Sequence, residues 1–278
     1  MTVTPLFPAM TSRQLRGMMA ALGPTHGHAP LRYTWPRYCY EMRRHCARDK
    51  PQEFLSWPTV IETIFVGDAP YIKTELKALK ASGLRTWAAA LEEPGFGNPP
   101  RLPYYPKTSG NLVHHAYHLL QFKRATGLRM RDVGDVLEFG GGYGAMALMA
   151  QRLGHSGTWT IVDLPEMSLL QLYYLTNVGA DMRRVRLIDQ LPSCDEPVSL
   201  IVALWSLSEA PLKARDEFDA RCSADAYLIS YQPDWHGLNN EEWFSAFRRK
   251  RPGIRWSVEQ AAMGSRYLFG VRDGRNTR

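Results

Sequence analysis

The chain has 278 residues, of which 45% are apolar, and a formal net charge of +7 at pH 7. This composition can bury a sizeable core, so it excludes an intrinsically disordered chain. No apolar run approaches the roughly 18 residues that a membrane-spanning helix needs, and prolines interrupt the N-terminal segment where a secretion signal would be apolar. We therefore expect a soluble cytoplasmic protein without a membrane partner.

The first 130 residues are expected to form an N-terminal helical cap that ends in an irregular connector. Helical candidates cover residues 13–22, 37–48, 71–91 and 111–127. The connector at 93–106 is rich in proline and glycine, which excludes regular structure there.

Residues 131–278 change character and are expected to form a second domain. Short apolar runs at 135–139, 159–164, 184–188, 199–205, 226–231 and 266–271 alternate with helical stretches at 143–153, 165–178, 211–222 and 240–249. This alternation predicts an α/β fold, a Rossmann-like three-layer sandwich with a mostly parallel sheet. A further strand at 256–260 would pair with the last run and put an antiparallel pair at the sheet edge.

The strongest functional signal is the glycine-rich turn between the first strand of that domain and the helix that follows. It reads Glu138-Phe-Gly140-Gly141-Gly142-Tyr143-Gly144. Glycines let the backbone turn sharply and approach a ligand closely, and the next helix points free N–H groups at the same space. Parallel sheets of this kind bind ligands at the carboxyl ends of their strands, which places the site here.

Two cofactors compete for this turn. Gly140-x-Gly142-x-x-Ala145 fits the dinucleotide fingerprint of NAD(P) oxidoreductases. The carboxylate of Glu138, however, would repel a pyrophosphate and suits the cationic amino group of S-adenosylmethionine (SAM). Together with Gly144 it makes the E-x-G-x-G-x-G pattern of class I methyltransferases, which favours SAM.

Two acidic residues follow the next two strands. Asp163, with Leu164 beside it, lies about 20 positions beyond the glycines, where a carboxylate accepts hydrogen bonds from ribose hydroxyls. The alternative is that Asp163 caps the helix beginning at Pro165. Asp189 is a candidate for the adenine amino group, or equally a turn residue.

These segments resemble a known family, the bacterial sugar O-methyltransferases, which are class I SAM-dependent enzymes. The resemblance rests on residues 136–144, 161–165 and 205–209 and on the segment 109–118, and it extends over roughly 107–240. It implies SAM as methyl donor and a hydroxyl acceptor, often on a saccharide. The family thus implies an O-methyltransferase acting on a small molecule, a sugar or glycosylated metabolite.

Methyl transfer to an alcohol needs an aligned acceptor and a base that takes its proton. The segment Trp205-Ser206-Leu-Ser208-Glu209 follows the fourth strand; Trp205 and Ser206 are candidates to contact the cofactor, and Glu209 is a candidate base or sugar ligand. The alternative is that Ser208 and Glu209 only cap the next helix.

Histidines supply the other candidates for the base. His236 follows the fifth strand beside Asp234 and has a suitable intrinsic pKa, and a surface histidine in a turn before Gly237 is the alternative, only slightly less favoured. His114 and His118 share a helical face, so His114 is a candidate on a lid helix. No carboxylate or cysteine stands near them in sequence, so we expect no metal site.

The remaining features are expected to be uninvolved in the chemistry. No two cysteines are spaced as C-x-x-C, which predicts buried or unreactive thiols at Cys39, Cys46, Cys194 and Cys222. Basic residues concentrate at 247–251 and 272–278, where solvated surface is favoured over nucleic-acid binding. A nucleic-acid methyltransferase is disfavoured, because Asn98-Pro-Pro-Arg precedes the first strand and lacks the aromatic that stacks on a flipped base. A non-catalytic SAM-binding protein is a further alternative for the function. A homodimer formed through the cap is an alternative to a monomer.

Overall fold

The computed structural model describes residues 7–23, 35–192 and 197–274. They form two compact units that interleave along the chain, and each is described by itself. The first unit comprises Met1–Tyr117, Gly142–Leu153 and Asp163–Arg183, and the second comprises His118–Gly141, Gly154–Val162 and Arg184–Arg278. The expected domain division between residues 1–130 and 131–278 stays a prediction.

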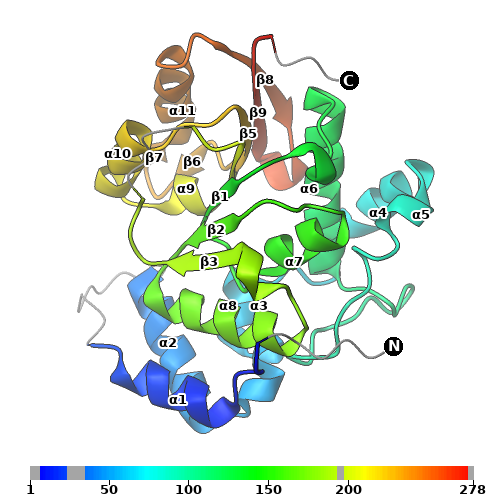
Figure 1. Ribbon diagram of the computed structural model, residues 1–278, viewed down its shortest axis with the longest axis vertical. Coiled ribbons are helices and arrows are strands. Elements are labelled where there is room, and N and C mark those ends of the chain that lie inside the picture. The colour runs from blue at the N-terminus through cyan, green and yellow to red at the C-terminus, as the bar shows by residue number, and fades with distance from the viewer. Residues whose placement is uncertain (1–6, 24–34, 193–196, 275–278) are drawn as a thin grey trace. The chain divides into compact units, whose positions relative to one another are not determined.

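The second unit is built on a seven-stranded sheet in the order β3-β2-β1-β4-β5-β9-β8 (Figure 1). The strands are β1 (Val136–Phe139), β2 (Trp159–Val162), β3 (Val185–Ile188), β4 (Leu200–Leu204), β5 (Ala226–Tyr231), β8 (Ile254–Gln260) and β9 (Arg266–Arg272). The first five run parallel, while β9 is antiparallel to both β5 and β8. The predicted Rossmann-like sheet and its antiparallel edge pair are thereby confirmed.

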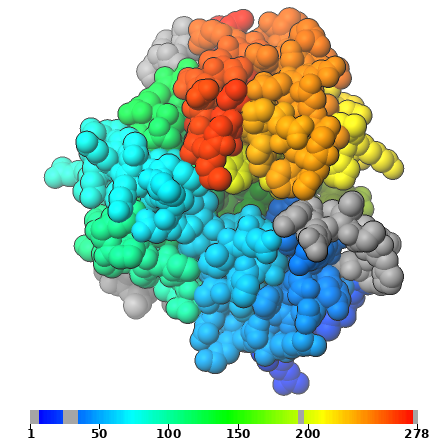
Figure 2. Space-filling view, turned by 180° about the vertical axis from the view of Figure 1, so that it is seen from behind, coloured from blue at the N-terminus to red at the C-terminus, as the bar shows by residue number. Residues whose placement is uncertain are grey.

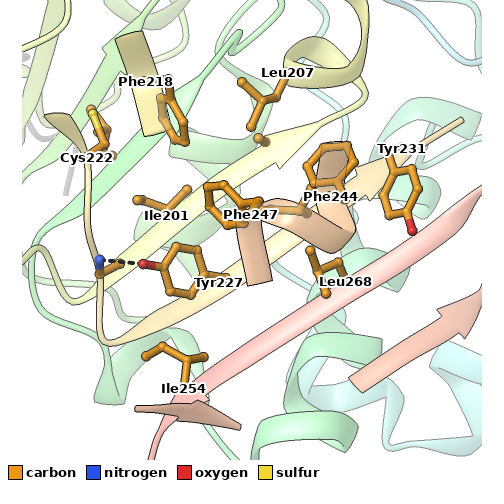
Figure 3. Close-up of a cluster of buried hydrophobic side chains, with 14 of the residues drawn as sticks. Ile201, Leu207, Phe218, Cys222, Tyr227, Tyr231, Phe244, Phe247, Ile254 and Leu268 are labelled. Atoms are coloured by element: carbon orange, nitrogen blue, oxygen red, sulfur yellow. Dashed lines mark hydrogen bonds between the residues drawn. The ribbon is translucent and has the colours of Figure 1, made fainter. Parts of the chain in front are cut away.

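Helices of the second unit pack on both faces of this sheet, which makes three layers. On one face, aromatic side chains of α10 (Leu212–Arg221) and α11 (Asn240–Arg249) join strand residues in a buried apolar cluster, which includes Phe218, Phe244 and Leu268 (Figure 3). Side chains alternate along β9, so Tyr267 points to the opposite face, where it hydrogen-bonds to His118 of α6 (Gly110–Thr126) at 2.6 Å.

The edge of the sheet at β8 lies at the surface. Most side chains of β8 are exposed or half-buried, and the C-terminal strands, orange to red in Figure 2, lie on the face shown there. The remaining short elements of this unit are η2 (Met130–Asp132), α9 (Ser206–Glu209), β6 (Asp234–Trp235), β7 (Leu238–Asn239) and η4 (Ala262–Gly264).

The first unit is helical. Its elements are α1 (Ser12–Ala21), α2 (Trp35–Arg48), η1 (Pro51–Ser56), α3 (Pro58–Thr63), α4 (Ile72–Ala81), α5 (Leu84–Trp87), the start of α6, α7 (Ala145–Arg152) and α8 (Pro165–Asn177), with η3 (Met182–Arg184) at its end. Phe54 is fully buried among the rings of Trp57, Phe96, Tyr143, Tyr173 and Tyr174. This aromatic cluster joins the N-terminal helices to α8 and to Tyr143, which precedes α7, within one core.

The prediction of a single helix over 71–91 is wrong in one respect, because this segment forms two helices, α4 and α5. Gly83 adopts a φ of 109°, a conformation that ends α4 and that a residue with a Cβ rarely adopts. The short helices η1 and α3 were not predicted; each has a proline in its first turn, where the missing N–H is tolerated.

Three cysteines are buried, as the sequence predicts. They are Cys39, Cys46 and Cys222, whereas Cys194 lies outside the described residues. Burial raises the pKa of the Cys46 thiol to about 11, which keeps it protonated and unreactive at neutral pH. Across the ranges that the structure covers, no helix is both long and apolar enough to span a bilayer.

Candidate functional site

The parallel strands end at one edge of the sheet. Phe139 of β1 pairs with Val162 of β2, and the backbone N–H of Gly140 donates to the Val162 carbonyl at 2.9 Å. The residues that follow β1, β2, β3, β4 and β5 are Gly140, Asp163, Asp189, Trp205 and Gln232. The strand order reverses between β1 and β4, and ligands bind at such a switch point in open α/β sheets.

Glu138 is buried directly beside the glycine turn. It is 3% exposed, and its Oε2 accepts a hydrogen bond of 2.7 Å from the indole Nε1 of Trp159 on β2. The same oxygen lies 3.1 Å from the position that a Cβ on Gly141 would take. A carboxylate therefore lies against the backbone of the second glycine, and the indole fixes its orientation.

Gly140 and Gly141 are required for steric reasons. Gly140 has a φ of 73°, and a Cβ there would overlap the Cβ of Ser206 and lie 2.8 Å from its Oγ. That hydroxyl donates to the Phe139 carbonyl, so Ser206 is held against the turn. A Cβ on Gly141 would lie 2.6 Å from the Cγ2 of Ile161. The two glycines therefore let β1 turn closely against its neighbours.

The second half of the turn belongs to the first unit. Gly142 has a φ of 57°, and Gly144, which precedes α7, has a φ of 92°; both conformations favour glycine. The Gly142 carbonyl accepts a hydrogen bond of 3.0 Å from Nε2 of Gln171, a fully buried side chain on α8.

Gln171 also orients Asp163. Its Nε2 donates to Oδ2 of Asp163 at 2.7 Å, while Oδ1 accepts from the backbone N–H of Leu164 at 2.8 Å. The N-cap of α8 is Leu164, whose side chain makes no capping hydrogen bond, so Asp163 does not occupy the N-cap position. Leu164 is 40% exposed. Gln171 was not predicted, and its only signal in the sequence is that it is a polar residue in an otherwise apolar run of α8.

Tyr143 packs into the first unit. Its side chain is 1% exposed, its hydroxyl accepts a hydrogen bond of 2.8 Å from Nδ2 of Asn111, and its ring lies edge-on to Tyr174. The Oδ1 of Asn111 in turn accepts from the Val66 N–H at 3.1 Å. The aromatic ring therefore anchors the glycine turn within the first unit, and the contact of Tyr143 with the cofactor stays a prediction.

A buried carboxylate, Glu93, lies in the same unit. Its Oε2 accepts a hydrogen bond from the hydroxyl of Ser109, and its Oε1 has no hydrogen-bond partner among the described residues. Burial raises the pKa of Glu93 to about 7, although Ser109, Arg101 and Arg152 oppose the shift. The carboxyl group of Glu93 therefore keeps its proton up to a higher pH in the folded protein than in the unfolded chain.

This raised pKa predicts a loss of stability with increasing pH. Between the ordinary pKa of 4.5 and about 7 the unfolded chain loses its proton first, so the free energy of unfolding falls as pH rises through this range. Glu93→Gln removes this slope and is expected to be more stable than the wild type at pH 8, by an amount on the order of 3 kcal/mol. Urea unfolding at pH 5 and pH 8 measures it. The exposed neighbour Glu92→Gln is the control, and parallel pH profiles for Glu93→Gln and the wild type would contradict the assignment.

The segment after β4 lies over the end of β5. Trp205 has a φ of 66°, its N–H donates to the Ser230 carbonyl at 2.7 Å, and its indole donates to the Ser230 hydroxyl at 3.1 Å. The half-buried Glu209 accepts a hydrogen bond of 3.1 Å from Nε2 of Gln232. Neither Ser208 nor Glu209 caps α10, whose N-cap is Pro211, so the capping alternative does not hold for that helix.

His236 lies in a tight hairpin turn after β5. The hairpin pairs β6 with β7, and His236 and Gly237 have φ values of 50° and 83°, as two-residue hairpin turns require. His236 is exposed, and its ring lies 4.6 Å from that of Trp235. Asp234 accepts a hydrogen bond from the Gly237 N–H at 3.2 Å. The histidine is thus a turn residue, as one alternative had it, and it remains accessible to a ligand.

Left-handed conformations gather at this edge of the sheet. Besides Trp205 and His236, the 77% exposed Met263 has a φ of 55°, in the turn that leads into β9. Because β9 begins opposite Tyr231 at the end of β5, the three residues flank the ends of three neighbouring strands. Such conformations cost about 1–3 kcal/mol each and are concentrated at functional sites.

The histidines of α6 bind different partners. In the first unit, Nδ1 of the buried His114 lies 3.0 Å from both carboxylate oxygens of Glu75. Burial lowers the pKa of His115, in the same unit, to about 3. In the second unit, His118 bonds to Tyr267. Glu75 lies 39 residues from His114 in sequence, which is why sequence analysis missed it. Over the described ranges, no three metal-binding side chains gather closely enough to hold an ion.

Asp189, the candidate adenine ligand, lies exposed in a bend after β3. It belongs to the second unit with Glu138, Gly140, Gly141, Trp205, Ser206, Glu209 and His236. The other predicted residues, which are Gly142, Tyr143, Gly144, Asp163, Leu164 and His114, belong to the first.

No protein-family model and no curated protein matches the chain. Among solved structures, a SAM-dependent methyltransferase from Aquifex aeolicus is similar over 55% of this chain and 90% of its own, with 18% identity and a TM-score of 0.39. Magnesium protoporphyrin IX methyltransferase from Synechocystis PCC 6803, with bound SAM, covers 75% of this chain and 100% of its own, with 13% identity and a TM-score of 0.42. Precorrin-6y C5,15-methyltransferase from Geobacter metallireducens GS-15 covers 62% and 94%, with 14% identity and a TM-score of 0.41. Similarity at this level assigns neither a cofactor nor a substrate to the chain.

Proposed function

We propose that this protein is a SAM-dependent methyltransferase. The observation that carries the proposal is the position of Glu138, a buried carboxylate 3.1 Å from the site of a Cβ on Gly141. A ligand bound over the glycine turn meets this negative charge at short range. The charge attracts an ammonium group and repels a pyrophosphate, which favours SAM over a dinucleotide.

The residues present fit SAM by their chemistry. Glu138 would accept hydrogen bonds from the methionine amino group, and the glycine turn would admit the ligand close to its backbone. Asp163 would bind the ribose hydroxyls, with Leu164 and Asp189 on the adenine and Trp205 and Ser206 beside the reacting end. When bound, SAM supplies an electrophilic methyl group; the chain itself positions the acceptor, excludes water and takes up a proton.

The first experiment is a calorimetric titration of the full chain with SAM, S-adenosylhomocysteine and NADH. Micromolar binding of the two sulfur ligands, weakened in Asp163→Ala, supports the proposal. Binding of NADH instead would replace it with an oxidoreductase. Binding of the SAM pair without turnover of any acceptor would leave a non-catalytic SAM-binding protein.

Gln171 provides a second test of the cofactor site. Gln171→Leu removes the hydrogen bonds to Asp163 and to the Gly142 carbonyl, so we expect SAM to bind about tenfold more weakly. Gln151→Leu is the matched control, because Gln151 is also a helical glutamine of the first unit but bonds to the backbone of Asp181. Equal affinities for the two variants would exclude a role for Gln171.

For the acceptor, we propose a hydroxyl on a small molecule, with a saccharide as the preferred class. Support comes from the polar and aromatic groups after β4 and β5, where carboxylate and imidazole groups bind hydroxyls and a ring stacks on a sugar face. His236 and Glu209 are the candidates for the base in the second unit, and His114, paired with Glu75, is the candidate in the first. Because each is a proton acceptor, no metal is needed in this scheme.

An acceptor screen that measures S-adenosylhomocysteine formation would test this part of the proposal, with monosaccharides, glycosides, phenols and polynucleotides compared. Loss of turnover in only one of His236→Asn, Glu209→Gln and His114→Asn would identify the base. Turnover confined to polynucleotide, with steep salt dependence, would favour a nucleic-acid methyltransferase.

We also propose a cytoplasmic location. Light scattering would decide whether a homodimer forms.

A further inference from the structure

Among the residues that the structure describes, Arg215 of α10 is a buried cation without a carboxylate partner. Its side chain is fully buried, and the part of the chain covered by the structure places no carboxylate in an ion pair with it. Its guanidinium donates instead to three neutral oxygens, which are the Ala210 carbonyl at 2.7 Å, Oδ1 of Asn240 at 2.5 Å and the Ser208 carbonyl. Burial lowers the pKa of Arg215, yet arginine stays charged in proteins.

Those three bonds connect the segments that follow β4 and β5 (Figure 1). Ser208 and Ala210 belong to the segment after β4. Asn240 begins α11, and its Nδ2 donates to the Gln232 carbonyl at 2.7 Å, directly after β5. One guanidinium therefore fixes two neighbouring segments at the carboxyl edge of the sheet.

Gln232 completes a network that ends on Glu209. Its Oε1 accepts from the Ser208 hydroxyl at 2.6 Å, and its Nε2 donates to Oε1 of Glu209 at 3.1 Å. The bonds from Ser208 to Gln232, from Gln232 to Glu209 and from Arg215 to Asn240 all depend on the separation of the two segments. A shift of the Ser208 backbone would therefore change the orientation of the Glu209 carboxylate.

A purely structural arginine would not require this arrangement. Burying a cation is costly, and an apolar side chain of similar length could fill the same volume at a lower cost. What an apolar side chain cannot do is bind three oxygens in fixed directions, for which the planar guanidinium is suited. The free-energy cost of burying the Arg215 cation is explained if the activity depends on the positions of the two segments.

We propose that Arg215 is a positioning residue for the methyl-transfer site, which holds the segments 205–210 and 232–240 and thereby orients Glu209. The proposal rests on the proposed function for the role of Glu209. Arg215 itself is fully buried, and it would act through its bonds to Ser208, Ala210 and Asn240. Its effect is on the geometry of the edge where the acceptor binds.

The test compares Arg215→Met with Arg251→Met in the full chain. Arg251 is a matched control, because it is also a largely buried arginine of the second unit, but its bonds go to Asp219 and to the carbonyls of Phe247 and Cys222. Hydrogen–deuterium exchange of peptides 205–210 and 232–240 is measured beside urea unfolding. We expect about tenfold or faster exchange of both segments in Arg215→Met, beyond any change in the control with a similar loss of stability.

Equal exchange in the two variants would reduce Arg215 to a structural residue and overturn the proposal. If Arg215→Met does not fold, Asn240→Ala serves instead, because it keeps the arginine and breaks the link to Gln232. This variant is expected to speed up the exchange of segment 232–240 in the same way. Unchanged exchange of that segment would also overturn the proposal. Arg215→Lys serves as the conservative variant, which should recover part of the protection. Failure of the wild type to bind SAM would remove the proposed function but leave the exchange result standing, so the two failures are distinguishable.

Discussion

Replacing Glu138 with glutamine is expected to weaken SAM binding by about 10- to 150-fold while leaving the fold intact. A hydrogen bond to a charged group contributes about 1.5–3 kcal/mol to the free energy of binding, and losing this contribution corresponds to the expected loss of affinity. Glutamine keeps the shape of the side chain, and its amide oxygen can still accept the bond from the indole of Trp159. Calorimetry with SAM measures the loss, and a urea titration shows that the unfolding midpoint is retained.

Glu259→Gln is the control for this experiment, because Glu259 is exposed on β8 and its replacement removes the same charge from the chain. It should bind SAM like the wild type. NADH gives a result of opposite sign: a dinucleotide site would bind its ligand more tightly once the carboxylate is neutral. Tighter NADH binding by Glu138→Gln, with SAM affinity unchanged, would thus reverse the cofactor assignment.

Gly140→Ala is expected to destabilise the protein by about 3 kcal/mol and to abolish SAM binding. The left-handed φ of 73° alone costs a residue with a Cβ about 1–2 kcal/mol. The added methyl group would also overlap Ser206, which the hydrogen bond to the Phe139 carbonyl holds in place, and overpacking of this kind costs about 1–3 kcal/mol. Urea unfolding measures the stability.

Gly179→Ala separates the two effects. Gly179 has nearly the same φ, 74°, but no atom lies within 4 Å of the position of its Cβ. The control should therefore show the conformational cost without the steric one, and it should bind SAM normally. If both variants lose equal stability, Ser206 moves aside and the turn at Gly140 is less tightly packed than the structure indicates.

The sequence predicted the sheet and the turn because both depend on local patterns. Short apolar runs separated by helical stretches identified the strands to within one or two residues, and the spacing of Glu138 from the glycines located the turn. The break at Gly83 and the hairpin around His236 were missed. An isolated glycine in a helical pattern is tolerated as often as it ends a helix, and two-residue strands are too short to show a period.

The partners of the site residues could not be predicted, because long-range contacts leave no local pattern. Gln171, Trp159 and Gln232 each bond to a proposed site residue from a different element. In the sequence only Gln171 stands out as a polar residue in an apolar run, while Trp159 lies between two threonines and Gln232 lies before a proline. Arg215 was equally inconspicuous, since an arginine on an amphipathic helix is normally assigned to its solvent face.

The three residues with positive φ at the sheet edge, Trp205, His236 and Met263, have a consequence for the evolution of this protein. Glycine would remove the conformational strain of a positive φ at each position. Selection for thermal stability alone should therefore enrich glycine there. This chain instead has a tryptophan, a histidine and a methionine at these positions, three side chains suited to contacting ligands. If melting temperature rises in Met263→Gly or His236→Gly while turnover falls, the two properties are in direct conflict at this edge, and the sequence reflects a compromise between them.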